Sequence, residues 1–350
     1  MATAISHSRV EAYLSCRRKD WYGYQFPTDI GRGIRRQQTS DSLGMGTAFH
    51  RIAAVYYTVF LNGGEREEAQ EYAWGEYERI IEEGFEEAGG QKATLETVVH
   101  RWIDNETLSE DYEILGVEQE FNLQSDEGEF PFIVDLLVRD RRTGLVYVVD
   151  HKTGYYLYRP EYTDLMPQVP KYIGALRALG YNIAGGLYQV VRTQALQGKK
   201  MLKPELIMTV GEALGISDDE QAMKILSKNT VANLEAICDE KGIEHCTPPD
   251  PEQVLQILPL DPSLDRVLET VREQFEVAQE IRERDEWPEE DQDRRAYRTA
   301  NQTVCKSCNF RLICAEELRG GNTGLVLLAE YEAKPKRDAI EVSEEVDDEV

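Results

Sequence analysis

Four of the six cysteines in this 350-residue sequence lie in two groups that could share one inorganic centre. Cys16 lies near the start of the chain, and Cys305, Cys308 and Cys314 lie near its end in the pattern C-x₂-C-x₅-C. Four thiolates are a common ligand set for both structural zinc and iron–sulfur clusters. The pattern therefore predicts a centre that joins the two ends of the chain, and the spacing alone is compatible with either zinc or iron and sulfur.

The remaining cysteines, Cys238 and Cys246, lie outside this set. Uneven spacing and the lack of an apolar secretory signal at the N-terminus argue against a disulfide framework and favour reduced thiols. We interpret Cys238 and Cys246 as ordinary thiols, because a free cysteine is usually buried.

A second set of reactive side chains lies in the middle of the chain. Asp135 interrupts the apolar run FIVDLLV, and Asp150 and Lys152 follow the apolar run VYVV. A carboxylate inside a β-strand is unfavourable unless it is paired or binds a cation. Asp150 and Lys152 are two residues apart and so face the same side of a strand. A metal beside a lysine can activate water and stabilise a phosphodiester transition state, although a plain Asp–Lys ion pair would give the same pattern.

The elements that must position these residues follow from the periodicity of the chain. Apolar residues at helical spacing predict a first helix that begins after Ser6 or Ser8 and carries Cys16 at or near its end. Further helices are expected over residues 44–64, 65–110, 163–179 and 262–284, and strands over 113–123, 130–139, 145–151 and 185–193. Consecutive strands next to helices predict an α/β layer.

The charge of the chain is strongly negative but unevenly distributed. The net charge is −26, yet residues 1–40 carry seven bases and three acids, and residues 294–319 carry six bases and two acids. The two segments that hold the cysteines are thus locally basic, as nucleic-acid binding requires, although solvated helix faces would look the same. No apolar run is long enough to span a bilayer, so we expect a cytoplasmic protein without membrane partners.

Taken in order along the chain, these residues resemble the RecB-like branch of the PD-(D/E)XK nuclease superfamily. The similarity consists of G-x₃-H ending at His50, then Asp135, then D-x-K at Asp150 and Lys152, then Q-x₃-Y from Gln168 to Tyr172. Cysteines on both sides of this core resemble the four-cysteine members, which include the CRISPR-associated exonucleases numbered four, the AddB nuclease domain and related phage exonucleases. The resemblance covers about residues 5–192 and 300–318.

The resemblance implies a role for each matching residue. His50, Asp135 and Asp150 match the ligands of Mg²⁺ or Mn²⁺, with the backbone carbonyl of His151 as a further contact. Lys152 matches the lysine that positions the attacking water and steadies the scissile phosphate.

Other matches extend this set. Gln168 and Tyr172 match the helix motif that holds the DNA strand, and either Glu118 or Glu120 matches an acidic position that can join the site. The four cysteines match the ligands of a [4Fe–4S] cluster, which favours iron–sulfur over zinc. The bases that follow Cys16 suit single-stranded DNA: Arg17 and Arg18.

The implied fold is restriction-endonuclease-like α/β, in which helices flank a central mixed β-sheet and an iron–sulfur clasp joins the N- and C-terminal segments. We predict five regions: an N-terminal helical lobe (1–110), a nuclease core (111–193), a helical insertion or extension (194–293), a cysteine segment (294–332) and an acidic, disordered tail (333–350).

The implied activity is that of a metal-dependent DNA exonuclease acting on single-stranded DNA or DNA ends, with 5′→3′ polarity favoured, in phage or mobile-element recombination or repair. Two alternatives stay open at this point: a CRISPR-spacer-processing nuclease, and a non-cutting DNA-binding or assembly subunit. DNA is the expected partner, and further copies of the chain or recombination and CRISPR-adaptation proteins are partners that the resemblance leaves open.

Overall fold

A computed structural model describes residues 4–37, 41–85, 93–196, 199–216, 218–243, 246–247 and 253–334. Its centre is a five-stranded sheet in the order β10-β7-β6-β5-β4. The strands are β4 (Tyr112–Ser125), β5 (Gly128–Asp140), β6 (Val146–Gly154), β7 (Ile183–Arg192) and β10 (Leu255–Leu260). β6 and β7 are parallel, and the other neighbours are antiparallel. The predicted α/β fold with a central mixed sheet is therefore confirmed.

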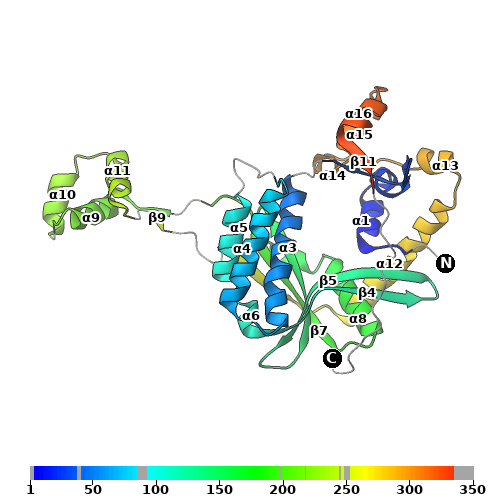
Figure 1. Ribbon diagram of the computed structural model, residues 1–350, viewed down its shortest axis with the longest axis horizontal. Helices are drawn as coiled ribbons and strands as arrows, with labels where there is room; N and C mark the ends of the chain where they lie inside the picture. Colours follow the sequence, from blue (N-terminus) through cyan, green and yellow to red (C-terminus); the bar gives the residue numbers. More distant parts are fainter. Residues whose placement is uncertain are drawn as a thin grey trace.

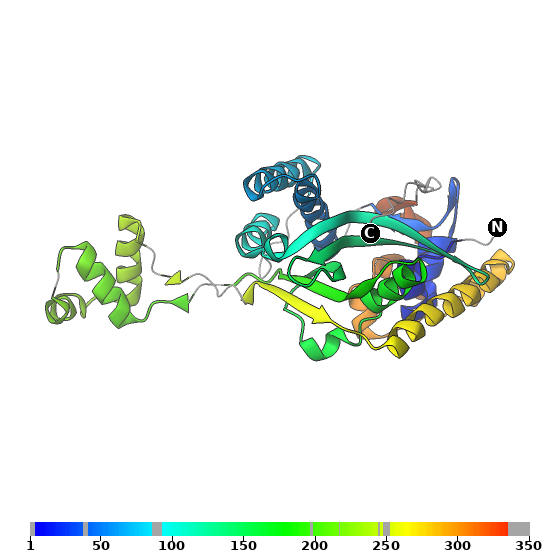
Figure 2. The ribbon, with the colours of Figure 1, turned by 90° about the horizontal axis from the view of Figure 1, so that it is seen from below.

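Helices cover both faces of this sheet (Figure 2). One face packs against α3 (Asp41–Leu61), α4 (Arg66–Glu82) and α5 (Leu95–Asn105), and the other against α8 (Gln168–Ala178) and α12 (Leu264–Asp285). Each face of the sheet has its own hydrophobic core, and adjacent side chains of one strand point into different cores. Val149 of β6 faces α3, while Val148 faces α8. The sheet is thus buried on both sides, and a polar side chain within it needs a hydrogen-bonding partner or a cation.

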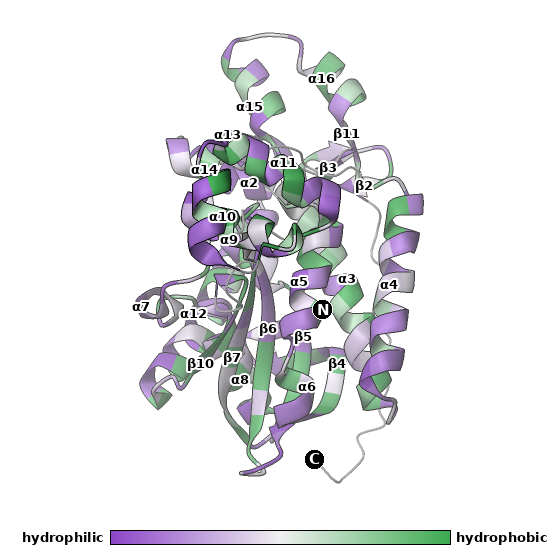
Figure 3. Cartoon of the chain, turned by 90° about the vertical axis from the view of Figure 1, so that its left-hand side faces the viewer, coloured by the Kyte–Doolittle hydropathy of each residue, from purple (hydrophilic) through white to green (hydrophobic). Residues whose placement is uncertain are grey.

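The helices on the first face form largely where the sequence predicts them. Gly63, with a φ of 79°, follows the end of α3 in the left-handed conformation that glycine tolerates. In Figure 3, α4 carries both hydrophilic and hydrophobic colours, which fits the stripe of Ala69, Ala73 and Ile80 that it buries. A short helix, α6 (Leu108–Asp111), leads into β4.

The helix predicted over 163–179 is divided in the structure. A short α7 (Pro160–Thr163) precedes α8, which begins at Gln168 directly after Pro167. Proline disfavours helical backbone in the residue before it but is tolerated in a first helical turn, as at Pro170. Gly174 lets α8 approach α12 closely, since a Cβ there would lie 2.5 Å from Val271 Cγ2.

The predicted helical region, residues 194–293, spans more of the chain than the separate helical module that the structure shows. Helices α9 (Lys203–Ala213), α10 (Asp219–Leu226) and α11 (Val231–Lys241) share their own core, which includes the buried Cys238. Figures 1 and 2 both show this module apart from the sheet, next to the paired strands β8 (Lys199–Lys200) and β9 (Cys246–Thr247). By contrast, β10 and α12 belong to the central layers. Pro259 in the run LQILPL fits an edge strand, where a missing N–H is tolerated.

The two ends of the described chain meet in one lobe, which we call the cysteine lobe (residues 4–37 and 287–334). Figure 1 shows the blue N-terminal elements beside the orange and red C-terminal ones. The lobe contains α1 (His7–Ser15), α2 (Arg17–Asp20), the π-helix η1 (Trp21–Gln25), β1 (Pro27–Thr28), β2 (Gly31–Arg32), β3 (Ile34–Arg36), α13 (Glu289–Arg294), α14 (Gln302–Lys306), α15 (Arg311–Leu318), α16 (Thr323–Glu330) and β11 (Tyr331–Ala333). β3 pairs with β11.

This arrangement differs from the predicted division in how the N-terminal half of the chain is distributed. Residues 4–37 associate with the C-terminal segment, whereas α3 to α6 of the predicted N-terminal lobe cover the sheet. The predicted disordered tail lies outside the described residues from 335 onward. Within the described residues, no helix combines the length and hydropathy needed to cross a membrane.

Candidate metal centre and cysteine cluster

Three side chains from three elements meet at one end of the sheet. His50 comes from α3, Glu118 from β4 and Asp135 from β5, and one ligand atom of each lies within 4.8 Å of the other two. His50 Nδ1 is 3.5 Å from Asp135 Oδ2 and 4.0 Å from Glu118 Oε1. One imidazole and two carboxylates suit a divalent cation such as Mg²⁺ or Mn²⁺.

Glu118 reaches this group through an unusual backbone conformation. Its φ is 45°, which is rare for a residue other than glycine. Glu118 lies between the paired positions Val117↔Leu136 and Gln119↔Val134, and so opposite Asp135. Of the two glutamates that the sequence offered, the structure brings Glu118 to the group, while the exposed Glu120 is not a member of it. Strained backbone often marks functional positions.

The hydrogen bonds of His50 leave one ring nitrogen free for a cation. His50 Nε2 lies 2.9 Å from the backbone oxygen of His151, which can only accept a hydrogen bond. We therefore assign the proton to Nε2, which leaves the lone pair of Nδ1 directed towards the carboxylates. A lone pair facing carboxylate oxygens is repulsive unless a proton or cation lies between them.

The electrostatics of the centre also fit a cation. Burial, together with the nearby charge of Asp150, holds the pKa of Asp135 well above its usual value. Burial lowers the pKa of His50, so its imidazole is neutral and able to act as a ligand at physiological pH. The Asp135 carboxylate is satisfied only in part, by a hydrogen bond of 2.7 Å from the His151 N–H.

His151 contributes its backbone to this centre, while its side chain lies elsewhere. The imidazole is 2% exposed and stacks on Tyr57, with ring centroids 5.5 Å apart. Burial lowers the pKa of this ring well below its usual value. The carbonyl that we expected to contact a metal accepts the hydrogen bond from His50, and its second lone pair stays available.

Asp150 and Lys152 form a buried pair beside the cation group. Asp150 is 1% exposed, and Lys152 Nζ lies 2.9 Å from its Oδ1 and 2.7 Å from its Oδ2. Burial alone would lower the pKa of Lys152, but the Asp150 carboxylate raises it above its usual value, so the ammonium stays charged. Asp150, predicted as a metal ligand, is outside the three-residue group and pairs with Lys152.

The Q-x₃-Y motif lies behind Lys152. Gln168 Oε1 accepts a hydrogen bond of 3.0 Å from Lys152 Nζ, and Gln168 Nε2 lies 3.4 Å from Tyr172 Oη. Tyr172 is itself stacked on Phe132 of β5, with centroids 5.1 Å apart. The two residues that we expected to hold DNA are thus also placed to fix the position of the Lys152 ammonium.

A buried polar network that the sequence did not reveal lies behind the His151 side chain. Gln189 of β7 donates to Tyr57 Oη over 3.1 Å, and the buried Glu106 accepts from the same hydroxyl over 3.0 Å. Trp102 Nε1 donates to Gln189 over 3.1 Å. Since Tyr57 stacks on His151, this network fixes the peptide that faces the cation group. The sequence offered one indication of this network, which is Gln189, a polar residue within an apolar strand.

The four bracketing cysteines all lie in the cysteine lobe. Cys308 and Cys314 pack against the core around Trp21 and Phe310, and Cys16 follows α1. Thr299 N donates to Cys16 Sγ over 3.5 Å, and Arg298 Nε donates to Cys314 Sγ over 3.2 Å. Burial raises the pKa of the Cys308 thiol.

The spacing of these sulfurs differs from that of a single-metal site. Among the described residues, no three cysteine sulfurs lie within 4.8 Å of one another. Around one tetrahedral zinc, ligand sulfurs would be about 3.8 Å apart, as follows from a Zn–S distance of about 2.3 Å. The lobe thus contains all four thiols, but the described structure does not bring them into one close group.

The two arginines after Cys16 have different environments. Arg18 is 4% exposed, pairs with Asp293 and Glu317, and lies 4.1 Å from the Trp21 ring centroid. These contacts stabilise the lobe and leave Arg18 little surface for DNA. Arg17 is exposed, so only Arg17 of the two is placed to meet a ligand.

Asp135→Asn tests the cation group through stability. The amide oxygen can still accept from His151, but the buried charge is lost. At a hundredfold excess over its Kd, Mn²⁺ is expected to stabilise the wild type by about 2.7 kcal/mol, or roughly 4 °C in Tm, and the variant hardly at all. Calorimetry with and without Mn²⁺ measures this difference, and an equal metal-dependent gain in the variant would exclude the site.

The same variant should also change the pH dependence of stability. A carboxyl whose pKa is raised by folding retains its proton in the folded state, so stability falls as pH rises from about 3.9 through the raised value. Metal-free Asp135→Asn lacks this loss and should be at least as stable as the wild type above that range. Exposed Asp140, whose pKa is lowered by the backbone N–H of Thr143, provides the control substitution Asp140→Asn.

Comparison with known proteins supports the same interpretation. No curated protein matches the chain. A family model described as the PD-(D/E)XK nuclease superfamily matches residues 4–315, which include the sheet, the cation group, the Asp150–Lys152 pair and all four bracketing cysteines. The match covers nearly the whole chain, and it places the protein in the class of metal-dependent nucleases: the chain belongs to the PD-(D/E)XK nuclease superfamily.

Proposed function

We propose that this nuclease is a Mg²⁺- or Mn²⁺-dependent DNA exonuclease that removes nucleotides from single strands or DNA ends. The observation that carries the proposal is the charged Lys152, held by Asp150 and Gln168 beside the group of His50, Glu118 and Asp135. A cation held by that group would polarise the phosphate and make its bound water more acidic.

The protein side chains supply the rest of the chemistry. The Lys152 ammonium can donate hydrogen bonds to the attacking water and to the phosphate oxygens on which negative charge develops. Asp150 keeps this ammonium protonated, and Gln168 fixes its direction. Neutral His50 and the carboxylates of Glu118 and Asp135 would hold the cation, while the His151 backbone orients His50 and Asp135.

We further propose a [4Fe–4S] cluster as the structural clasp of the cysteine lobe. The support is the resemblance to four-cysteine nucleases, the presence of the four thiols in one lobe, and the hydrogen bond from Arg298 to Cys314. Hydrogen bonds to sulfur and partial burial are features of such clusters. In the clasp, Cys16 would link the end of α1 to α14 and α15.

The setting that we propose is phage or mobile-element recombination or repair, with 5′→3′ polarity. CRISPR-spacer processing is a second setting for the same chemistry. The alternative of a non-cutting DNA-binding subunit is less well supported, because a protein without cleavage activity would not need the complete set of Asp135, Asp150 and Lys152.

A digestion of end-labelled DNA tests the activity, the polarity and the strand preference together. Single- and double-stranded DNA labelled at either end is incubated with the full chain and Mn²⁺ or Mg²⁺. Early release of mononucleotide from the 5′ label, with the 3′-labelled strand shortening gradually, would support 5′→3′ exonuclease action. Internal cuts would show that the enzyme is an endonuclease instead. Tight DNA binding without cleavage in either metal would favour the non-cutting subunit.

A further inference from the structure

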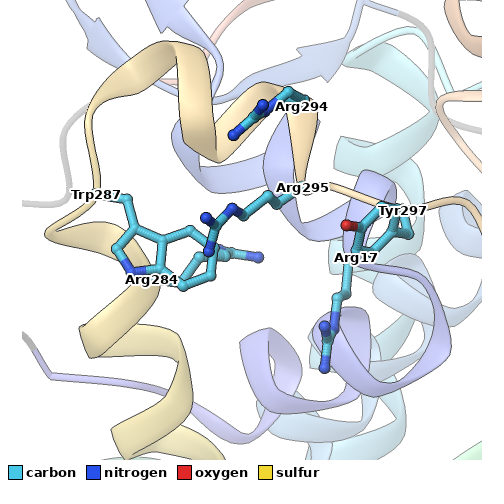
Figure 4. Close-up of a pocket in the computed structure, with 6 residues that line it drawn as sticks. All are labelled: Arg17, Arg284, Trp287, Arg294, Arg295 and Tyr297. Carbon is cyan, nitrogen blue, oxygen red and sulfur yellow. The ribbon is translucent and has the colours of Figure 1, made fainter.

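An arginine-rich pocket in the cysteine lobe is separate from the cation group. It has a volume of about 590 Å³ and lies between α2 on one side and α12, α13 and the following segment on the other. Figure 4 shows the side chains that line it: Arg17, Arg284, Trp287, Arg294, Arg295 and Tyr297. None of the described residues that line it is acidic, although the whole chain carries a charge of −26.

Two of these guanidinium groups have no carboxylate partner among the described residues. Arg295 lies over the Trp287 ring, 4.5 Å from its centroid, and Arg17 lies over the Tyr13 ring at 5.0 Å. Both side chains are exposed. An arginine is always charged, and its planar donors fit the oxygens of a phosphate. The pocket thus holds two positive charges that nothing described in the protein neutralises.

The other two arginines add positive charge. Arg294 is exposed and pairs with Asp291 over 2.7 Å, outside the lining of the pocket. Arg284 is 2% exposed and its charge is balanced by Asp20 and Asp285. Nevertheless, Arg284 Nε and Nη1 are buried without a hydrogen-bond acceptor. Because both atoms are buried, Arg284 contributes positive charge to the wall of the pocket and does not offer these donors to a ligand.

The aromatic residues indicate which kind of anion fits. Tyr297 is 65% exposed, and Trp287 is half-buried beside Arg295. A base can stack on such rings while arginines bind the adjacent phosphates, which is how proteins hold single strands without regard to sequence. A simple phosphate or sulfate site would have no use for an exposed aromatic ring next to its arginines.

We propose that this pocket binds phosphates and a base of a single DNA strand at a point away from the cation group. The inference rests on the proposed function for the identity of the polymer as DNA. The pocket shares its wall with the cysteines, because Arg17 follows Cys16 directly and Arg18 N donates to Tyr297 O over 3.1 Å. That backbone hydrogen bond joins the two walls of the pocket, so the lobe would hold a DNA strand at a point separate from Lys152.

Strand binding in EDTA tests the pocket without cleavage. A fluorescent single strand of about 20 nucleotides, longer than one typical binding module covers, is titrated against the full chain by anisotropy. Arg17→Gln with Arg295→Gln should weaken binding by about tenfold or more, since hydrogen bonds to charged groups are strong. The slope of log K against log salt should decrease in magnitude by about 1.4, or 0.7 per lost phosphate contact.

The matched control removes the same charge elsewhere. Arg272 and Arg319 have side chains that are 69% and 74% exposed, and both lie outside the pocket. Arg272→Gln with Arg319→Gln should leave affinity within about twofold and the salt slope nearly unchanged. Tyr297→Ala should weaken binding while keeping the slope, because stacking on an aromatic ring involves no counterions. Unaltered melting temperatures would show that the variants fold.

Two results would overturn the proposal. Equal binding by the pocket variant and its control would show that the arginines do not contact the strand. Binding of thymidine monophosphate as tight as that of the strand, lost in the pocket variant, would make this a free-nucleotide site. Cleavage by the wild type in Mn²⁺ is measured in a separate experiment. A protein that binds DNA through the pocket but never cuts it would refute the proposed nuclease function and leave the binding pocket standing.

Discussion

Lys152→Met is expected to reduce metal-dependent DNA cleavage by about 10³-fold, within the range that positioned acid–base and electrostatic groups contribute. Methionine keeps most of the side-chain length but removes the ammonium that Asp150 and Gln168 hold in place. The loss should appear mainly in kcat, because the ammonium acts most strongly on charge that develops in the transition state. Single-turnover cleavage of a labelled strand at saturating enzyme measures it.

This variant also has a structural cost that must be separated from the catalytic one. Without Lys152, the Asp150 carboxylate would be buried and unpaired, which destabilises a protein by about 3–5 kcal/mol. The double variant Asp150→Asn with Lys152→Met removes both charges and should recover most of the stability without recovering activity. Chemical denaturation of the wild type, the single variant and the double variant measures the free energy of unfolding of each.

The outcomes distinguish three roles for Lys152. Low activity in a stable double variant supports participation of the Asp150–Lys152 pair in cleavage, and the kcat of the single variant assigns the loss to Lys152. Activity that returns together with stability would make the lysine a structural partner of Asp150. Activity of the single variant within about tenfold of the wild type would remove Lys152 from the mechanism, because that is less than acid–base groups normally contribute.

Cys308→Ser is expected to abolish the cluster and to destabilise the cysteine lobe. Anaerobically purified wild type should be brown, with broad absorption from thiolate-to-iron charge transfer, and the variant should be nearly colourless. Structural metal sites contribute roughly 10–16 kcal/mol to folding in small domains, and we expect the loss here to be on the order of 5 kcal/mol. Iron and sulfide analysis together with calorimetry provides the measurement.

The cluster-free lobe should keep part of its structure. Arg18 still pairs with Asp293 and Glu317, and Thr299 Oγ1 donates to Ser15 O over 2.6 Å. Limited proteolysis should therefore cut residues 4–37 and 287–334 faster than the sheet, and Mn²⁺ should still raise the stability of the nuclease core. DNA cleavage should fall because the strand is held less well, not because the cation group is altered.

Cys238→Ala is the matched control for this experiment. Cys238 is fully buried, but it lies in the core of the α9–α11 module, outside the bracketing set. The variant should keep its colour, its iron content and its cleavage rate while destabilising only that module. A Cys308→Ser protein that remained iron-loaded and equally stable would exclude Cys308 as a ligand. A colourless wild type that contains zinc would show that the four cysteines bind zinc and not an iron–sulfur cluster.

Periodicity and composition were sufficient for much of this architecture. The apolar, β-rich runs of β5 and β6, the glycines after α3 and the serine before α1 are local signals, and the structure has strands, a helix end and an N-cap where they predict them. The order of His50, Asp135, Asp150 and Lys152 along the chain was enough to indicate a metal-dependent nuclease, because that order resembles the motifs of the superfamily.

Other features depended on contacts between distant segments. The sequence left Glu118 and Glu120 equivalent, and only the left-handed backbone at Glu118, opposite Asp135, distinguishes them. Asp150 is predicted as a metal ligand, and the tertiary structure alone reveals that it also pairs with Lys152. The same holds for β10, whose place at the edge of the sheet is set by pairing with β7, about 65 residues earlier in the chain.

The sequence by itself thus determined which chemical groups are present and which local elements carry them. Tertiary structure alone decided which groups meet: the cation group from α3, β4 and β5, the two chain ends that form the cysteine lobe, and the pocket between Arg17 and Tyr297. The physical reason is that helix and strand patterns arise from interactions between near neighbours in the chain. A binding site, by contrast, depends on how whole elements pack, and packing distances are not encoded in any short segment.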